Sequence, residues 1–165
     1  MARVLLLLGG GFTRTEFSIK QLLEWKGHNV RVAGKHRLQE TSKEGDKVTP
    51  DLAFYEINPD YFDCVVVIGE DMKEVARPET IAIIRKCATE KKGVVGVNNG
   101  AVMLAFAGIL NGKRATVAKS EKSITFLRDS GARYVSDAIV VDGKIITAAH
   151  PEAAEEIVAA MAKML

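Results

Sequence analysis

The fold is decided by residues 93–104, which read Gly93-Val94-Val95-Gly96-Val97-Asn98-Asn99-Gly100-Ala101-Val102-Met103-Leu104. The apolar, β-branched first part predicts a strand, and the last part is a run of helix formers. A sharp turn from a strand into a helix is the outline of a nucleophile elbow, which lifts one side chain above the end of a sheet. The residue at the tip is Asn98, whose carboxamide is not a nucleophile. The sequence therefore predicts the architecture of a covalent-catalysis site without the reacting atom.

The same residues could form a different turn. Asn99-Gly100 is a favoured dipeptide of β-hairpins, in which case the following segment would be a strand. Residues 101–106 favour a helix and lack the alternation of a strand, so we expect the elbow. After Gly, Asn is the residue that best tolerates the strained backbone of an elbow tip.

Apolar runs alternate with amphipathic segments along the chain. The pattern predicts strands at residues 4–8, 30–33, 64–68, 93–97 and 114–118, and helices at 15–26, 78–90, 101–107, 120–130 and from 151 onward. Asp142-Gly143 predicts a late hairpin between residues 138–141 and 144–148, and residues 34–51 are expected to be irregular or short β structure. This alternation is typical of an α/β fold, here a three-layer sandwich with a mainly parallel sheet in one domain of residues 1–165.

Composition excludes several function classes. Apolar residues make up 47% and charged residues 27% of the chain, and the net charge is +2 with scattered basic residues. The pairs Lys91-Lys92 and Lys113-Arg114 are interpreted as solvated surface beside turns, so no nucleic-acid partner is expected. No stretch has transmembrane length and no signal peptide is visible, which favours a cytoplasmic protein without a membrane partner. Cys64 and Cys87 lie in apolar segments and are expected in the core.

The ligand crevice of a parallel sheet lies beyond the carboxyl ends of its strands. Four segments are expected there: residues 9–16, 69–71, 98–100 and 148–151. They supply the candidate site residues, which are Glu16, Asn98 and Asn99 for any chemistry, and Gly69, Glu70, Gly100 and His150 for ligand binding.

Two interpretations of Glu16 are open. It falls near the start of a helix, where a carboxylate stabilises the helix terminus, or it faces the crevice. Glu16, Glu70, Asp71 and His150 could together hold a hard metal ion, but no ligand spacing supports this, and ordinary loop acids are favoured. No metal is therefore predicted. The three glycines at residues 9–11 lack a dinucleotide-binding or P-loop pattern, so no cofactor is predicted either.

The order of these motifs resembles the ThiJ/PfpI superfamily, a class I glutamine amidotransferase-like group of flavodoxin-like fold. The matching pieces, spread over nearly the whole chain, are residues 4–8, Glu16, Phe62-Asp63 with residues 64–69, the elbow at 95–100, Ile109-Leu110-Asn111-Gly112 and Val141-Asp142-Gly143.

In typical members the elbow reads apolar-Cys-His-Gly, the Cys is the nucleophile and the early Glu hydrogen-bonds it. Glu16 carries over, whereas Asn98 stands at the Cys position and Asn99 at the His position. Gly69-Glu70 matches only part of the family's Gly-Gly. The resemblance therefore implies a degenerate member without the cysteine-dependent protease, deglycase and glyoxalase-like reactions. It also implies a hydrogen bond between the Glu16 carboxyl group and the Asn98 amide.

The preferred hypothesis is a pseudoenzyme, a non-catalytic small-ligand-binding or scaffold protein. The resemblance also implies a homo-oligomer, a dimer or larger. An alternative is a hydrolase or lyase in which Glu16 is the general base and Asn98 and Asn99 are oxyanion donors, without a covalent intermediate. A metal-dependent hydrolase is a third hypothesis.

Overall fold

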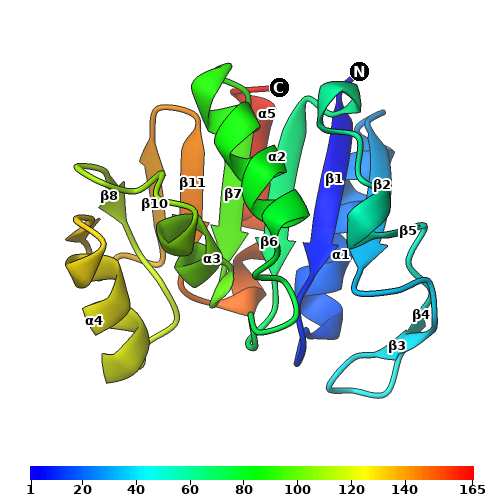
Figure 1. Ribbon diagram of the computed structural model, residues 1–165, viewed down its shortest axis with the longest axis horizontal. Coiled ribbons are helices and arrows are strands. Elements are labelled where there is room, and N and C mark those ends of the chain that lie inside the picture. Colours follow the sequence, from blue (N-terminus) through cyan, green and yellow to red (C-terminus); the bar gives the residue numbers. More distant parts are fainter.

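A seven-stranded sheet runs through the middle of the molecule in the computed structural model, which describes residues 1–165 (Figure 1). Its strand order is β10-β11-β7-β6-β1-β2-β5. The strands are β1 (Arg3–Leu8), β2 (Asn29–Gly34), β5 (Leu52–Ala53), β6 (Cys64–Ile68), β7 (Gly93–Val97), β10 (Ile139–Asp142) and β11 (Ile145–Ala148). Every neighbouring pair is parallel except the β10–β11 hairpin. The mainly parallel sheet with a late hairpin is confirmed.

Helices cover both faces of this sheet (Figure 1). The side chains of α1 and α5 pack on one face and those of α2 and α3 on the other, and α4 packs against α3 at the edge of that layer. The helices are α1 (Arg14–Trp25), α2 (Pro78–Thr89), α3 (Gly100–Phe106), α4 (Glu121–Asp129) and α5 (Ala154–Ala162). The predicted three-layer α/β/α sandwich of flavodoxin-like type is therefore confirmed.

Strand β1 shows why the central strands are continuous apolar runs. Leu5 and Leu7 point into the core beneath α2 and α3, whereas Val4, Leu6 and Leu8 point into the core beneath α1 and α5. Successive side chains of a strand alternate between the two faces, and here both faces are covered. A polar side chain at either set of positions would be buried away from water.

The segment of residues 114–118 differs from the prediction. Only β8 (Arg114–Ala115) is a strand, and it pairs with β9 (Arg133–Tyr134) outside the main sheet. The next residues are held by other partners, because Thr116 N donates to Thr147 Oγ1 at 2.9 Å and Ala118 N donates to the Asn98 carbonyl at 3.3 Å. The short strand predicted here is thus confirmed only at its first two residues, and it lies outside the main sheet.

Short elements complete the chain. The irregular segment of residues 34–51 contains a small hairpin of β3 (Glu40–Thr41) and β4 (Lys47–Val48), in line with the expectation of short β structure. Three 3-10 helices occur at Phe54–Glu56, Pro59–Tyr61 and Pro151–Ala153, and the last of these leads into α5. None of the helices combines the length and the apolar character needed to cross a membrane.

Candidate functional site at the elbow

Residues 97–100 form the elbow that the sequence predicts. Strand β7 ends at Val97, and α3 begins at Gly100. Asn98 lies between them with φ of +60°, in the left-handed region, which costs a non-glycine residue roughly 1–2 kcal/mol. Because β7 pairs in parallel with both neighbours, the turn does not join a hairpin, and that alternative is excluded.

Backbone hydrogen bonds from three distant segments hold the tip in place. Asn98 N donates to the carbonyl of Ala148 at 2.8 Å, and the Asn98 carbonyl accepts from Ala118 N. Asn99 N donates to the carbonyl of Gly69 at 3.1 Å. These hydrogen bonds hold Asn98 in its left-handed conformation. A strained backbone conformation persists only where surrounding contacts hold it in place.

The two asparagine side chains have different roles. Asn99 Nδ2 donates to the carbonyl of Glu70 at 2.8 Å, and its Oδ1 accepts from Ser123 Oγ at 2.9 Å. Its amide therefore ties the elbow to the end of β6 and to α4. The side chain of half-buried Asn98 makes no hydrogen bond within the protein, so its donors and its acceptor remain available to a ligand.

Gly100 permits the helix to start directly above the neighbouring strand. A Cβ atom built on Gly100 would clash with the Val67 carbonyl oxygen and lie 2.8 Å from its carbon. No side chain fits there without moving β6 or α3. Gly100 is thus a packing requirement of the elbow, whereas the sequence placed it among the ligand-binding residues.

Glu16 is completely buried and links α1 to the end of β6. Its Oε1 accepts from Thr13 N at 3.0 Å, and Thr13 Oγ1 accepts from Glu16 N, which forms a capping box. Its Oε2 accepts from Gly69 N at 2.7 Å. The carboxyl group therefore stabilises the helix terminus and also reaches the strand end that borders the elbow.

No hydrogen bond joins Glu16 to Asn98, so that prediction is wrong; the two carboxyl oxygens accept from Thr13 N and Gly69 N instead. The connection is indirect: Gly69 donates to Glu16 through its nitrogen and accepts from Asn99 through its oxygen. Burial raises the pKa of Glu16, and this effect outweighs the backbone hydrogen bonds from Gly69 and Thr13, which lower it.

The remaining candidates do not converge on one point. Glu70 is exposed and forms an ion pair with Lys43, and Asp71 pairs with Gly10 through the backbone. The half-buried His150 precedes the last 3-10 helix, and no hydrogen bond or ion pair links its ring to the other candidates. No group of three or more His, Cys, Asp and Glu side chains is arranged to hold a metal ion.

A pocket of about 370 Å³ borders the elbow. Asn99, Glu70 and Asp71 contribute to it, and Asn98 does not. Its further lining is Met72, Lys73, Val102, Lys122, Ser123 and Phe126. The sequence analysis did not identify the α4 residues of this lining, because α4 lies about twenty residues after the elbow in the chain. The hydrogen bond from Ser123 to Asn99 joins the two elements directly.

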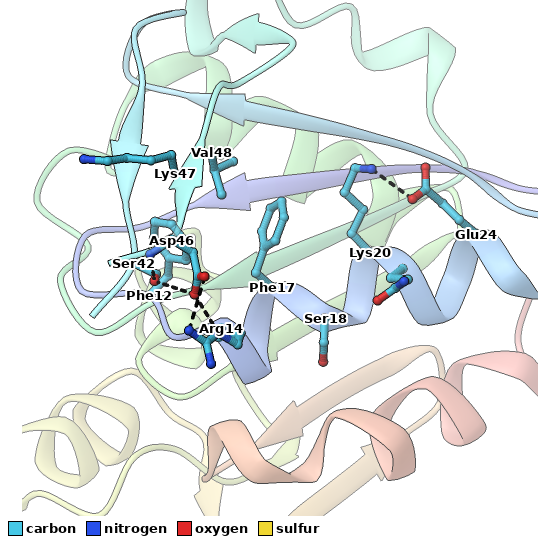
Figure 2. Close-up of a pocket in the computed structure, with 11 residues that line it drawn as sticks. Phe12, Arg14, Phe17, Ser18, Lys20, Glu24, Ser42, Asp46, Lys47 and Val48 are labelled. Atoms are coloured by element: carbon cyan, nitrogen blue, oxygen red, sulfur yellow. Dashed lines mark hydrogen bonds and ion pairs between the residues drawn. The ribbon is translucent and has the colours of Figure 1, made fainter. Parts of the chain in front are cut away.

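A second cavity, of about 440 Å³, lies between α1 and the β3–β4 hairpin (Figure 2). Several of its charged groups satisfy one another: Arg14 Nε lies 2.7 Å from Asp46 Oδ2, and Lys20 Nζ lies 2.9 Å from Glu24 Oε1. None of the candidate residues from the strand ends lines it. The elbow is therefore kept as the candidate functional site.

Both cysteines are free and fully buried, as expected. Burial raises the pKa of Cys64 far above its usual range and that of Cys87 to about 11. Only the thiolate is a nucleophile, so neither side chain is reactive at neutral pH.

A cysteine placed at the elbow tip is expected to behave differently. In the Asn98→Cys variant, iodoacetamide should modify residue 98 at least about 10-fold faster than Cys64 or Cys87, because the tip is half-exposed and lies in no apolar core. Peptide mass spectrometry of the folded protein measures the three rates. The wild type is the control and should react only after unfolding. Equal rates at all three thiols would contradict the elbow geometry.

The fold and the turn together define an α/β protein of the nucleophile-elbow type. A profile of the DJ-1/PfpI family matches residues 2–164, and the chain belongs to this family. The deglycase of Thermococcus kodakarensis is 33% identical over 153 residues, which cover 90% of each chain. The deglycase PfpI of Pyrococcus furiosus is 34% identical over 135 residues and 78% of each chain. A ThiJ/PfpI domain protein from Brachyspira murdochii superimposes with a TM-score of 0.89 at 25% identity, over 98% of this chain and 95% of that one.

Proposed function

We propose that this chain is a non-catalytic member of its family that binds a small polar ligand at the elbow. One observation carries the proposal. The strained position at the tip holds the carboxamide of Asn98, which has no hydrogen bond within the protein. The protein keeps a backbone conformation at Asn98 that costs free energy. The carboxamide presented there can form hydrogen bonds with a ligand but cannot act as a nucleophile.

The pocket beside the tip has mixed chemistry. Lys73 and Lys122 bring positive charge, Glu70 and Asp71 bring negative charge, and Phe126 supplies part of an apolar wall. Such a lining suits a small molecule with polar groups of both signs and a short apolar part, held in orientation by a few hydrogen bonds. Asn98 does not line this pocket, but its unpaired carboxamide at the neighbouring elbow tip offers a ligand a further donor and acceptor.

The competing function is a hydrolase or lyase with Glu16 as the general base. The raised pKa of Glu16 favours it, since burial makes this carboxylate a stronger base than an ordinary glutamate. Its geometry opposes it, because the side chain is fully buried and both oxygens accept backbone hydrogen bonds. A base must reach the proton that it removes, so α1 would have to move away from β6 first.

Turnover assays test the proposal. Because relatives are named deglycases, the substrates are methylglyoxal and a methylglyoxal-modified peptide. We expect no turnover by the wild type above the rate of a heat-denatured sample, because no thiolate is available at the tip. Turnover that is abolished by Asn98→Ala would overturn the proposal. Turnover whose pH profile follows one carboxyl group, and which is lost in Glu16→Gln, would favour the Glu16 mechanism instead.

A further inference from the structure

Four lysines line a cavity at the end of the sheet that lies opposite the elbow. Lys91 and Lys92 connect α2 to β7, Lys113 precedes β8, and Lys144 lies in the β10–β11 turn. In Figure 1 the α2–β7 connection and the β10–β11 turn lie at the upper end of β7 and β11, whereas the elbow lies at the lower end of β7. The cavity measures about 480 Å³, which is within the range of small-molecule sites.

Three of these cations are free. Lys91, Lys113 and Lys144 are exposed and make no ion pair or side-chain hydrogen bond. Lys92 Nζ donates to the carbonyl of Phe62 at 3.0 Å and lies 3.9 Å from Glu90. A bound anion would supply the counter-charge that these exposed ammonium groups lack.

The cavity contains one acidic side chain, that of Asp142. Its Oδ2 accepts a hydrogen bond from Arg114 N at 2.9 Å, which directs that oxygen toward the start of β8. One engaged carboxylate does not balance four ammonium groups, so the lining has a net positive charge. Ala88, Ile109 and Ile145 form an apolar part of the wall.

The backbone at Lys91 provides a second, independent observation. Lys91 has φ of +57° and follows the C-cap of α2, a place where helices commonly use glycine. The corresponding turns after α1, α3 and α4 do use glycine, namely Gly27, Gly108 and Gly131, all with positive φ. At α2 the chain instead keeps a strained lysine, and that side chain lines the cavity.

We propose that this cavity binds a small molecule carrying at least two phosphate groups. Several ammonium groups from separate turns can contact a diphosphate at once, whereas a single carboxylate would contact fewer of them. The apolar wall would receive the non-phosphate part of such a ligand. The fold thus brings the pair Lys91-Lys92, and Lys113 of the pair Lys113-Arg114, to the wall of one cavity.

Titration with inorganic pyrophosphate tests this proposal in the full-length protein. Calorimetry at about 50 mM NaCl should show saturable binding that is tighter than that of inorganic phosphate and that weakens as salt screens the charges. Lys113→Gln/Lys144→Gln should weaken binding about 10-fold, because two charged contacts are lost. Lys26→Gln/Lys47→Gln is the matched control, since it removes the same charge away from the cavity and should leave the affinity unchanged.

Two further measurements locate the site. Amide NMR shifts on adding pyrophosphate should centre on Lys91, Lys113 and Lys144, and Lys91→Gly should weaken binding several-fold while raising the Tm, because glycine relieves the backbone strain. The proposal is overturned by an absence of saturable binding, by equal weakening in the control double variant, or by shifts centred on Asn99 and Lys122. Each result is independent of whether the elbow binds its own ligand.

Discussion

Replacing Glu16 by alanine is expected to lower the free energy of unfolding by about 3 kcal/mol at neutral pH, a large share of the stability of an ordinary domain. The substitution leaves Thr13 N and Gly69 N without their acceptor and opens a cavity under α1. Each buried unpaired donor costs about 1–3 kcal/mol, and the lost side-chain volume adds to this. Urea denaturation followed by circular dichroism measures the difference.

The effect of this substitution depends on pH in a defined direction. Burial raises the pKa of Glu16 above its ordinary value of 4.5, so the folded protein holds the proton more tightly than the unfolded chain. The pH-dependent part of the stability that Glu16 contributes is then fully present below its ordinary pKa and is lost as the pH rises through the raised value. The difference between wild type and Glu16→Ala should therefore be larger at about pH 4 than at about pH 7.5.

Glu121→Ala is the matched control for both measurements. Glu121 is also an acidic residue in the first turn of a helix, but it is exposed, so its loss should cost less than about 1 kcal/mol. If Glu16→Ala were no more destabilising than this control, the buried carboxyl group would not hold α1 to β6. A pH dependence of the opposite sign would mean that hydrogen bonds outweigh burial at Glu16.

Gly100→Ala is expected to destabilise the protein by about 3 kcal/mol or more, or to prevent folding. The added methyl group would overlap the carbonyl group of Val67, which is backbone and cannot rotate away. Either β6 or α3 must then shift, and the hydrogen bonds of the elbow break with it. Thermal unfolding and the yield of soluble protein report the effect.

Gly10→Ala separates this steric argument from a general sensitivity to glycine replacement. A Cβ atom at Gly10 would lie 3.4 Å from the Cβ of Asp71, an ordinary contact, and the φ of Gly10 is not positive. We expect a change within about 0.5 kcal/mol. Comparable losses in the two variants would mean that the close approach at Gly100 is not what limits the choice of residue.

The main strands and the elbow could be predicted because their signals are local. The runs at Val65–Val67 and Leu5–Leu8 are apolar on both faces, and the change at Asn98 from β-branched residues to helix formers marks the turn. The edge strand β5 was missed, because two residues carry too little pattern to be recognised.

The partners of the site residues could not be predicted in the same way. Glu16 was expected to bond a side chain and instead bonds two backbone N–H groups, which every residue except proline possesses and no sequence pattern reveals. The pocket lining from α4 depends on where that helix packs. Its position follows from contacts such as Ser123 with Asn99, which join segments far apart in the chain.

The hydrogen bonds at the tip also have a consequence for folding kinetics. The backbone of Asn98 forms hydrogen bonds with residues 118 and 148, and the N–H of Asn99 donates to the carbonyl of Gly69. The chain loops that these hydrogen bonds close are therefore long. Native topologies of this kind assemble late, since loop-closure entropy is lost before any distant pairing compensates for it. We expect amide protection at Asn98 and Asn99 to appear only in the final phase of refolding, which makes these two amides reporters of the completed chain.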